Sequence, residues 1–399
     1  MRKIEIASVG LLIIVALCYM TPLFNYAGYV IIVGSIMLLF FLSGKHFDSK
    51  SITFLLLYAL SFVVYIIVNA SELVSHQLNN AVIMFFTTFT VYCLVSNRDI
   101  SSKEYRDENG MQIAHKLYNI DWVRCLYTVL LFFLVFELLL FAYANLGWWS
   151  GRMYYPNSTF PYGWNHVDMS VFTMGVFALG MKRGYHKSAS MLAIVASIVL
   201  PSRTWKLYLI VFVVLYLCQN QIDRLFKMRA FNSFFKQTIW IVLLTYFWSL
   251  LFVRVHPDYS TVVDSHQGLF DTSNYERFTG ILYGIEVIWK KALLFKSVNI
   301  DSVLYRDLIP SSLWRMGGRP HNSYVSIFLS YSVVYGLLFI KCLSNVINTV
   351  FYKRLIPYYL SYMIAATILH DMFSGIRLVF FLTVIIMPFQ EESLKQRAL

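Results

Sequence analysis

Repeated long apolar segments constrain this chain more than any other feature of its sequence. A helix that crosses a bilayer needs about 20 mostly apolar residues, and it satisfies all of its backbone polar groups internally. Segments that fit this template lie near 5–20, 25–43, 51–69, 78–95, 122–144, 167–181, 188–201, 204–219, 237–254, 322–343, 355–370 and 376–389. We therefore expect an all-α polytopic membrane protein with about 12 transmembrane helices.

The composition agrees with this expectation. Hydrophobic residues make up 58% of the 399-residue chain and charged residues 14%, whereas soluble domains are about 45–50% apolar and about 25% charged. The formal net charge of +12 would suggest a nucleic-acid partner in a soluble protein. In a membrane protein, basic residues instead gather in cytosolic loops and beside anionic head groups, so we expect no nucleic-acid partner.

The placement of basic residues predicts the topology. With the N-terminus inside, 21 of the 33 basic residues fall on the inner side, and the short outer segments hold only Arg152, Arg203, Lys206 and Arg377. The remaining eight lie on one long outer segment, 254–320, to which the positive-inside rule does not apply. This bias predicts a single integral domain over 1–399 with both termini cytoplasmic.

The long outer loop, 255–320, exceeds the length of a simple connector. Within 278–295, apolar residues recur at helical spacing at Ile281, Leu282, Ile285, Ile288, Trp289, Ala292 and Leu293, with Glu286, Lys290 and Lys291 on the other face. This pattern predicts an amphipathic helix. The helix either lies on the membrane surface over a site or packs against the bundle, and both interpretations stay open.

Several polar groups fall at or near the outer side of the predicted bundle. They are Arg152, His166, Arg203, Arg277, Arg319, His321, His370, Asp371 and Arg377. Charges at membrane depth are costly, and they normally face a cavity and serve a function. Converging guanidinium groups suit a phosphate or diphosphate, because each stays charged and offers paired hydrogen bonds. Snorkelling of each arginine to the lipid head groups is the competing interpretation.

Three of these residues have local contexts that favour chemistry. Arg203 lies in the tight turn "VLPSRTWKLYL", where Ser202 or Thr204 can cap the next helix and a helix N-terminus attracts anions. Arg277 has the same placement at the start of the amphipathic helix. His321 can accept a proton near neutral pH, since the unperturbed pKa of histidine is about 6.5, although a lone histidine is often structural.

Several kinds of site are absent from the sequence. The outer segments contain no His-x-x-x-His or Asp-x-Asp pattern, and the chain contains no P-loop and no Gly-x-Gly-x-x-Gly stretch. Such patterns are the usual signatures of metal and nucleotide binding. We therefore expect no metal and no cofactor.

Three stretches resemble, in order, motifs of the bacterial O-antigen polymerase and O-antigen ligase superfamily. "PSRT" around Arg203 is similar to a Ser-Arg turn between two middle spans, and "ERFTGILYGIEVIWKKALLF" resembles an arginine followed by a tryptophan-containing amphipathic helix. "RPHNSYVSIFLSYSVVYGLLF" resembles the opening of the next span. The likeness covers roughly 150–340. One departure is the family's Gly-x-Gly stretch before the histidine, where this chain has only Gly317-Gly318.

The resemblance implies a GT-C-like membrane glycosyltransferase in the bacterial cytoplasmic membrane, with its active site on the extracytoplasmic side. Its donor would be an oligosaccharide on undecaprenyl diphosphate, attacked by an acceptor sugar hydroxyl with inversion and without metal or cofactor. The implied catalytic residues are His321, Arg203 and Arg277. The implied substrate- and diphosphate-binding residues are Arg319, Arg152, Asn322, His166 and Arg377.

Three functions stay open, of which the first two follow from the resemblance and the third belongs to another class of membrane protein. The first is polymerisation of repeat units of a surface polysaccharide (O-antigen, capsule or exopolysaccharide), with a chain-length regulator and a flippase as candidate partners beside the lipid-linked substrates. The second is ligase-type transfer of glycan to a lipid or protein acceptor. The third is a lipid-linked oligosaccharide transporter or flippase, which predicts intramembrane charge pairs and broken helices at matching positions of both halves.

Overall fold

The structure is a computed structural model, and it describes most of the central part of the chain. The described residues are 49–71, 73, 75–96, 122–144, 166–200, 202–228, 230–255, 272–300, 320, 322–350, 356–369, 373, 377, 378 and 382. Within them the regular elements are helices, and no strand occurs. The all-α class is therefore confirmed for this part of the chain.

The helices follow the predicted apolar segments closely. They are α3 Ser49–Asn69, α4 Ser75–Ser96, α7 Trp122–Ala144, α8 His166–Lys182, α9 His186–Val199, α10 Arg203–Leu217, α11 Gln219–Lys227, α12 Phe234–Val255, α13 Thr272–Lys290, α15 Ser323–Tyr331, α16 Val333–Val350 and α17 Ile356–Leu369. Eight predicted segments correspond to one helix each. Segments 5–20 and 25–43 lie outside the described residues, as does most of 376–389.

The helices present apolar side chains outward as well as inward. Two described helices, α3 and α12, are long and apolar enough to cross a membrane, and a third span results if α10 and α11 are counted together across their 81° bend. α4, α7, α8, α9 and α16 contribute shorter apolar stretches. Many large apolar residues of α3, α7, α10 and α12 are exposed, which suits a hydrocarbon solvent. The fold is compatible with an all-α membrane protein, and the twelve spans stay a prediction.

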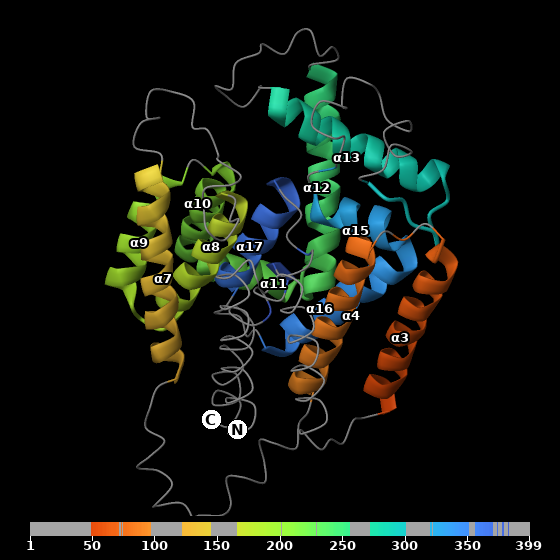
Figure 1. The fold of residues 1–399 in the computed structure, drawn as a ribbon, viewed down its shortest axis with the longest axis horizontal. Helices are drawn as coiled ribbons and strands as arrows, with labels where there is room; N and C mark the ends of the chain where they lie inside the picture. The colour runs from red at the N-terminus through yellow and green to blue at the C-terminus, as the bar shows by residue number, and fades with distance from the viewer. Residues whose placement is uncertain are drawn as a thin grey trace, which may run out of the picture.

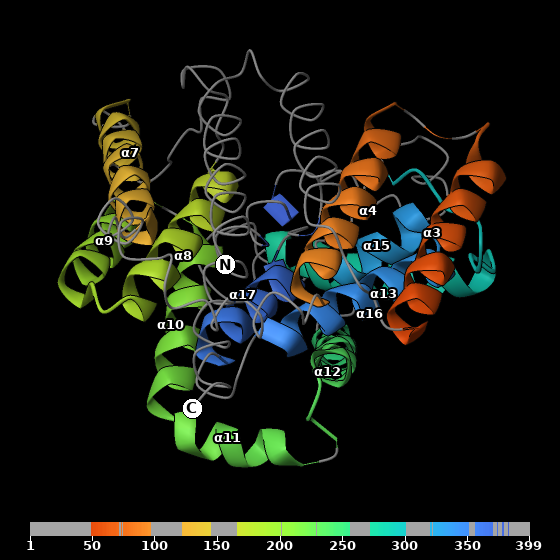
Figure 2. The same cartoon turned by 90° about the horizontal axis from the view of Figure 1, so that it is seen from below.

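α13 lies across one end of the bundle, which we call the α13 end (Figure 1). Phe252 near the end of α12 packs on Phe278 of α13, with ring centroids 4.8 Å apart. α10 and α15 begin, and α3 and α17 end, on this side of the bundle (Figure 1). α11 lies at one edge of the bundle, where it bridges α10 and α12 (Figure 2).

α11 was not predicted, because its sequence "QNQIDRLFK" is polar and lies almost wholly between the predicted spans 204–219 and 237–254. Hydropathy identifies apolar runs, and an amphipathic helix of nine residues leaves no such run. Its apolar residues Ile222 and Phe226 pack against the main core, while Arg224 and Lys227 are exposed. α11 therefore lies at the bundle surface, at a steep angle to α10.

Two helix ends use the left-handed backbone conformation, one with glycine and one without. Gly184 has φ 79° after α8, where Gly184 N–H donates to the Met181 carbonyl and Tyr185 N–H to the Gly180 carbonyl. Ala292 has φ 48° after α13 and closes the same pair of bonds, a Schellman motif. The sequence predicted α13 to continue to Phe295, but this motif ends it at Lys290.

The prediction of one continuous helix over 322–343 is wrong, because the structure divides this segment into α15 and α16. Ser332 separates them with φ 68° and ψ 159°. The first turn of α16 then approaches α15 so closely that a Cβ at Gly336 would lie 2.8 Å from the Phe328 ring. A continuous hydropathy run does not reveal a break that tertiary contacts stabilise.

An extended segment after α13, residues 293–298, satisfies the backbone groups freed by this break; we call it the strap. In Figure 1 it runs from the end of α13 past the end of α3. Its bonds are Val298 N–H to Leu329 C=O (2.8 Å), Val333 N–H to Leu293 C=O (3.0 Å) and Val334 N–H to Leu294 C=O (3.1 Å). Unpaired backbone groups are costly in an apolar setting, so the strap stabilises the broken helix.

Asn69, the last residue of α3, holds the strap in place. Its Oδ1 accepts from Ser297 N–H (2.8 Å) and from Ser297 Oγ (3.0 Å). Its Nδ2 donates to the Tyr65 carbonyl (2.8 Å) and to the Phe295 carbonyl (3.1 Å). This one buried side chain therefore ties the end of α3 to the strap, and through the strap to the α15–α16 break.

The Ser330 carbonyl at the end of α15 has two side-chain donors of its own. Tyr65 Oη donates to it over 3.1 Å, and Gln77 Nε2 of α4 donates to it as well. Tyr335 of α16 stacks against Tyr65, with ring centroids 5.5 Å apart. The break is therefore surrounded by α3, α4 and the strap.

Candidate functional site

α13 crosses α15 at Gly284, and this crossing brings two of the predicted motifs together. A Cβ at Gly284 would lie 2.7 Å from Val325 Cγ1 and 3.5 Å from Pro320 Cβ. Only the absence of a side chain allows this approach. The helix that carries Arg277 therefore rests on the first turn of α15.

We expect Gly284→Ala to separate the two helices. Overpacking of this kind costs about 1–3 kcal/mol, and thermal unfolding of the purified protein in detergent measures it. Because the clash is with Val325, Val325→Ala in the same chain relieves it, so the double variant loses less stability than the two single losses added together. Strict additivity would contradict the crossing.

The start of α15 is rigidly capped on both sides of His321. Asn322 Oδ1 accepts from Tyr324 N–H (3.0 Å) and Val325 N–H (3.1 Å), and only 1% of the residue is exposed. Ser326 Oγ donates to the Pro320 carbonyl over 2.9 Å. His321 itself lies outside the described residues. Capping occupies Oδ1 of Asn322, so its Nδ2 is the part of this side chain that can meet a substrate.

Phe373, which follows α17, packs on both parts of the broken helix. Its ring centroid lies 5.6 Å from Tyr324 of α15 and 6.0 Å from Phe339 of α16. Arg377, four residues further on, is half-buried. The segment after α17 therefore reaches the start of α15, where the resemblance implies a substrate.

Arg277 lies on the inward face of α13. It precedes Ile281 and Gly284 by four and seven residues, both of which are buried, so all three share one helix face. The Nε and Nη1 atoms of Arg277 are themselves buried. At a rise of about 1.5 Å per residue, Arg277 lies about 10 Å along the helix from its crossing with α15.

Arg203 is the first residue of α10 and is exposed. Ser202 Oγ accepts from Trp205 N–H over 3.3 Å, which confirms Ser202 as one of the two expected caps. Trp205 Nε1 also donates to Ser197 Oγ of α9 over 3.0 Å. These bonds fix the turn that presents Arg203 at the α13 end, on the far side of α17 from α15 (Figure 1).

The remaining predicted site residues are described only in part. His166 is the first residue of α8, and its side chain lies outside the described residues. Arg319, Arg152 and His321 are also outside them. Of the described candidates, Asn322 caps α15, Arg277 lies on the helix that crosses α15, and Arg203 lies at the same end of the bundle.

Helix dipoles add positive potential at this end. α10 and α15 both begin here with side-chain caps, and neither has an acidic residue in its first turn. A helix N-terminus carries about half a positive charge. Together with Arg203 and Arg277, these termini suit an anionic ligand such as a diphosphate.

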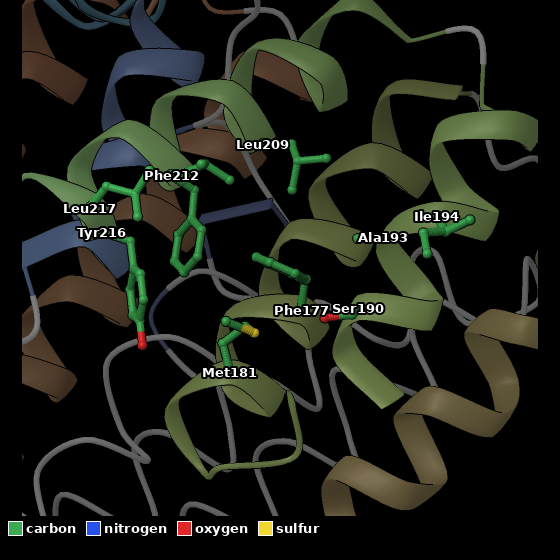
Figure 3. A pocket seen from close by; sticks show the side chains of 10 residues that line it. Phe177, Met181, Ser190, Ala193, Ile194, Leu209, Phe212, Tyr216 and Leu217 are labelled. Atoms are coloured by element: carbon green, nitrogen blue, oxygen red, sulfur yellow. The ribbon is translucent and has the colours of Figure 1, made fainter. Parts of the chain in front are cut away.

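A cavity of about 290 Å³ lies elsewhere, between α8, α9 and α10. Figure 3 shows its lining: Phe177, Met181, Ser190, Ala193, Ile194, Leu209, Phe212, Val213, Tyr216 and Leu217. No predicted site residue lines it, and its lining is almost wholly apolar. It carries no group suited to the predicted chemistry.

Comparison of the chain with protein-family models, with curated proteins and with solved structures finds no match in any of the three. Within the described part of the chain, no group of three His, Cys, Asp or Glu side chains is placed to hold a metal ion. A metal-free reaction stays a prediction.

Sequence reasoning missed the residues that position the site. Asn69, Gln77 and Ser332 were not singled out, although each is a polar residue in or beside a predicted span. Buried polar residues in such spans normally have partners or a function. That signal marks the residues as important, but it does not reveal that Asn69 meets a segment more than 220 residues away.

Proposed function

We propose that the chain is a membrane glycosyltransferase that polymerises lipid-diphosphate-linked oligosaccharide repeat units at the outer face of the bacterial cytoplasmic membrane. The observation that supports this most is the crossing of α13 and α15 at Gly284. It joins the arginine-containing amphipathic helix to the capped "HNSY" turn, two motifs that are about 40 residues apart in the sequence.

The proposed reaction is a single displacement at the anomeric carbon of the donor sugar. His321 takes the proton of the acceptor hydroxyl while the new glycosidic bond forms, a contribution of about 10²–10⁴ in rate. The bond between the anomeric carbon and the diphosphate oxygen breaks, and the electron pair leaves with lipid diphosphate. Arg277, Arg203 and the N-terminus of α15 stabilise the charge on the leaving diphosphate.

Ligase-type transfer to a lipid or protein acceptor uses the same chemistry and differs only in its acceptor. Transport is a second candidate that one observation favours, the break at Ser332 between α15 and α16. Transporters of the repeat type have broken helices at matching positions of both halves. The other sharp bend between described helices, 81° between α10 and α11, lies near the middle of the sequence, so it does not match Ser332 at a corresponding position of the first half.

The test uses a deletion strain complemented with His321→Ala, Arg203→Ala or Arg277→Ala. Loss of polymerisation leaves single repeats attached to the final acceptor, whereas loss of ligation leaves long polymer on the carrier lipid. We expect the first pattern, read from the glycan length profile. Normal-length polymer in all three variants would show that the site is assigned wrongly.

A further inference from the structure

The end of α13 that lies away from Arg277 carries an unusual surface, residues 289–296, which we call the α13 tip. Trp289 is 80% exposed, Leu294 53% and Phe295 45%. Lys290, Lys291 and Lys296 are exposed beside them. Large apolar side chains and lysines thus share one short segment of the surface.

The backbone fixes these side chains outward. The Schellman motif at Ala292 turns Leu293 inward, where it packs with Ile281 and Val287 in a small buried cluster. The next residues enter the strap, whose bonds to the broken helix leave Leu294 and Phe295 exposed. The exposed apolar residues therefore belong to an ordered surface.

Hydrogen bonds to α3 set the level of the tip in the bilayer. Asn69 Nδ2 donates to the Phe295 carbonyl over 3.1 Å at the last residue of α3. The exposed apolar face of α3 ends just before this point, at Ile67 and Val68. α3 has 21 residues, a length of about 31 Å, which matches the hydrocarbon core. As a membrane span, α3 would place Phe295 at the boundary between hydrocarbon and head groups.

The charge of the tip is positive. Lys290 pairs with Glu286, and no other acidic residue occurs between Val287 and Ile300, where Lys291 and Lys296 also lie. The tip belongs to the long segment 254–320, which the predicted topology places on the outer side. The positive-inside bias therefore does not explain lysines at this position.

We propose that the α13 tip is a docking surface for acidic phospholipid head groups of the outer leaflet. Trp289, Leu294 and Phe295 enter the interface, as aromatic residues do in membrane belts. Lys291 and Lys296 contact the phosphodiester anions, since juxtamembrane lysines are attracted to anionic lipids. This inference does not depend on the proposed enzymatic function.

The test uses the full chain in nanodiscs of phosphatidylcholine that contain a small fraction of photoactivatable phosphatidylglycerol. We expect crosslinks at residues 289–296, mapped by peptide mass spectrometry. Lys290→Gln, Lys291→Gln and Lys296→Gln together should lower their yield by about tenfold. Lys206→Gln, an exposed lysine on α10 at the same end, is the matched control and should leave it unchanged.

Three outcomes overturn the proposal. Equal labelling of the tip by a photoactivatable phosphatidylcholine would show that the tip does not distinguish acidic from zwitterionic head groups. An unchanged crosslink yield in the triple variant would show that the lysines do not bind the lipid. The absence of tip crosslinks in the purified chain would show that the surface is turned away from lipid, as expected of a protein-docking site.

Discussion

Arg277→Ala should reduce polymer formation by about 10²–10³-fold, the usual effect of removing one preorganised donor from a developing negative charge. Arg277 lies on the buried face of α13, with Nε and Nη1 buried, so its replacement removes a fixed charge near the start of α15. Initial rates with lipid-linked repeat units and membranes that contain equal amounts of each variant measure the loss.

Two further variants separate the guanidinium group from simple charge. Arg277→Lys keeps the charge but loses the paired hydrogen bonds, so we expect an intermediate rate. Arg254→Ala removes an exposed arginine from the last turn of α12 at the same end, and it should change the rate less than about twofold. Equal rates for Arg277→Ala and Arg254→Ala would exclude Arg277 from the reaction.

Asn69→Ala should produce a large loss of stability. The substitution removes four hydrogen bonds, each worth about 1 kcal/mol, and leaves buried groups of the strap without their partner. We expect a lower midpoint of thermal unfolding in detergent. Hydrogen exchange should also accelerate at the amides of Val298, Val333 and Val334, which pair across the break.

The aspartate variant is a sharper test of the Asn69 geometry. Asn69→Asp keeps an acceptor for Ser297 but turns a carboxylate toward the carbonyls of Tyr65 and Phe295, which now lack a donor. It should therefore destabilise the protein more than Asn69→Ala does. Asn220→Ala on the exposed face of α11 is the control, and a loss at Asn69 no larger than this one would contradict the role of the strap.

Hydropathy predicted those helices whose apolar run is continuous and whose ends are marked by polar residues. The segment 122–144 matches α7 at both ends, and the caps at Ser202 and Asn322 follow from ordinary N-cap chemistry. Local sequence suffices in these places because the bonds that define each helix end are formed within a few residues.

Two features of the fold could not be predicted from the sequence, because they depend on how distant parts of the chain pack together. The break at Ser332 is stabilised by the strap, about 35 residues earlier, and by Tyr65 and Gln77. Trp289 was placed on the apolar face of α13, yet it is among the most exposed aromatic residues. Its periodicity is helical, but the helix buries the face of Ile281 and Gly284 instead.

The sequence predicted on which side of the bundle the candidate residues lie, but it did not predict how the helices that carry them are arranged. The order of the spans and the bias of basic residues predicted that Arg203, Arg277 and the turn at His321 lie on one side. The close approach of α13 to α15 needed the structure, since Gly284 resembles any other helical glycine in the sequence. Its role appears only when Val325 is found 2.7 Å from its Cβ position.

The most direct test of the proposed function is a reaction with the purified chain in nanodiscs. The substrate is an oligosaccharide repeat unit on a radiolabelled polyprenyl diphosphate, with no nucleotide present. We predict longer glycans on the lipid, with one free polyprenyl diphosphate released for each glycosidic bond formed, and loss of both products in His321→Ala. Movement of the labelled lipid across the bilayer with no new glycosidic bond would contradict the proposal and identify a transporter.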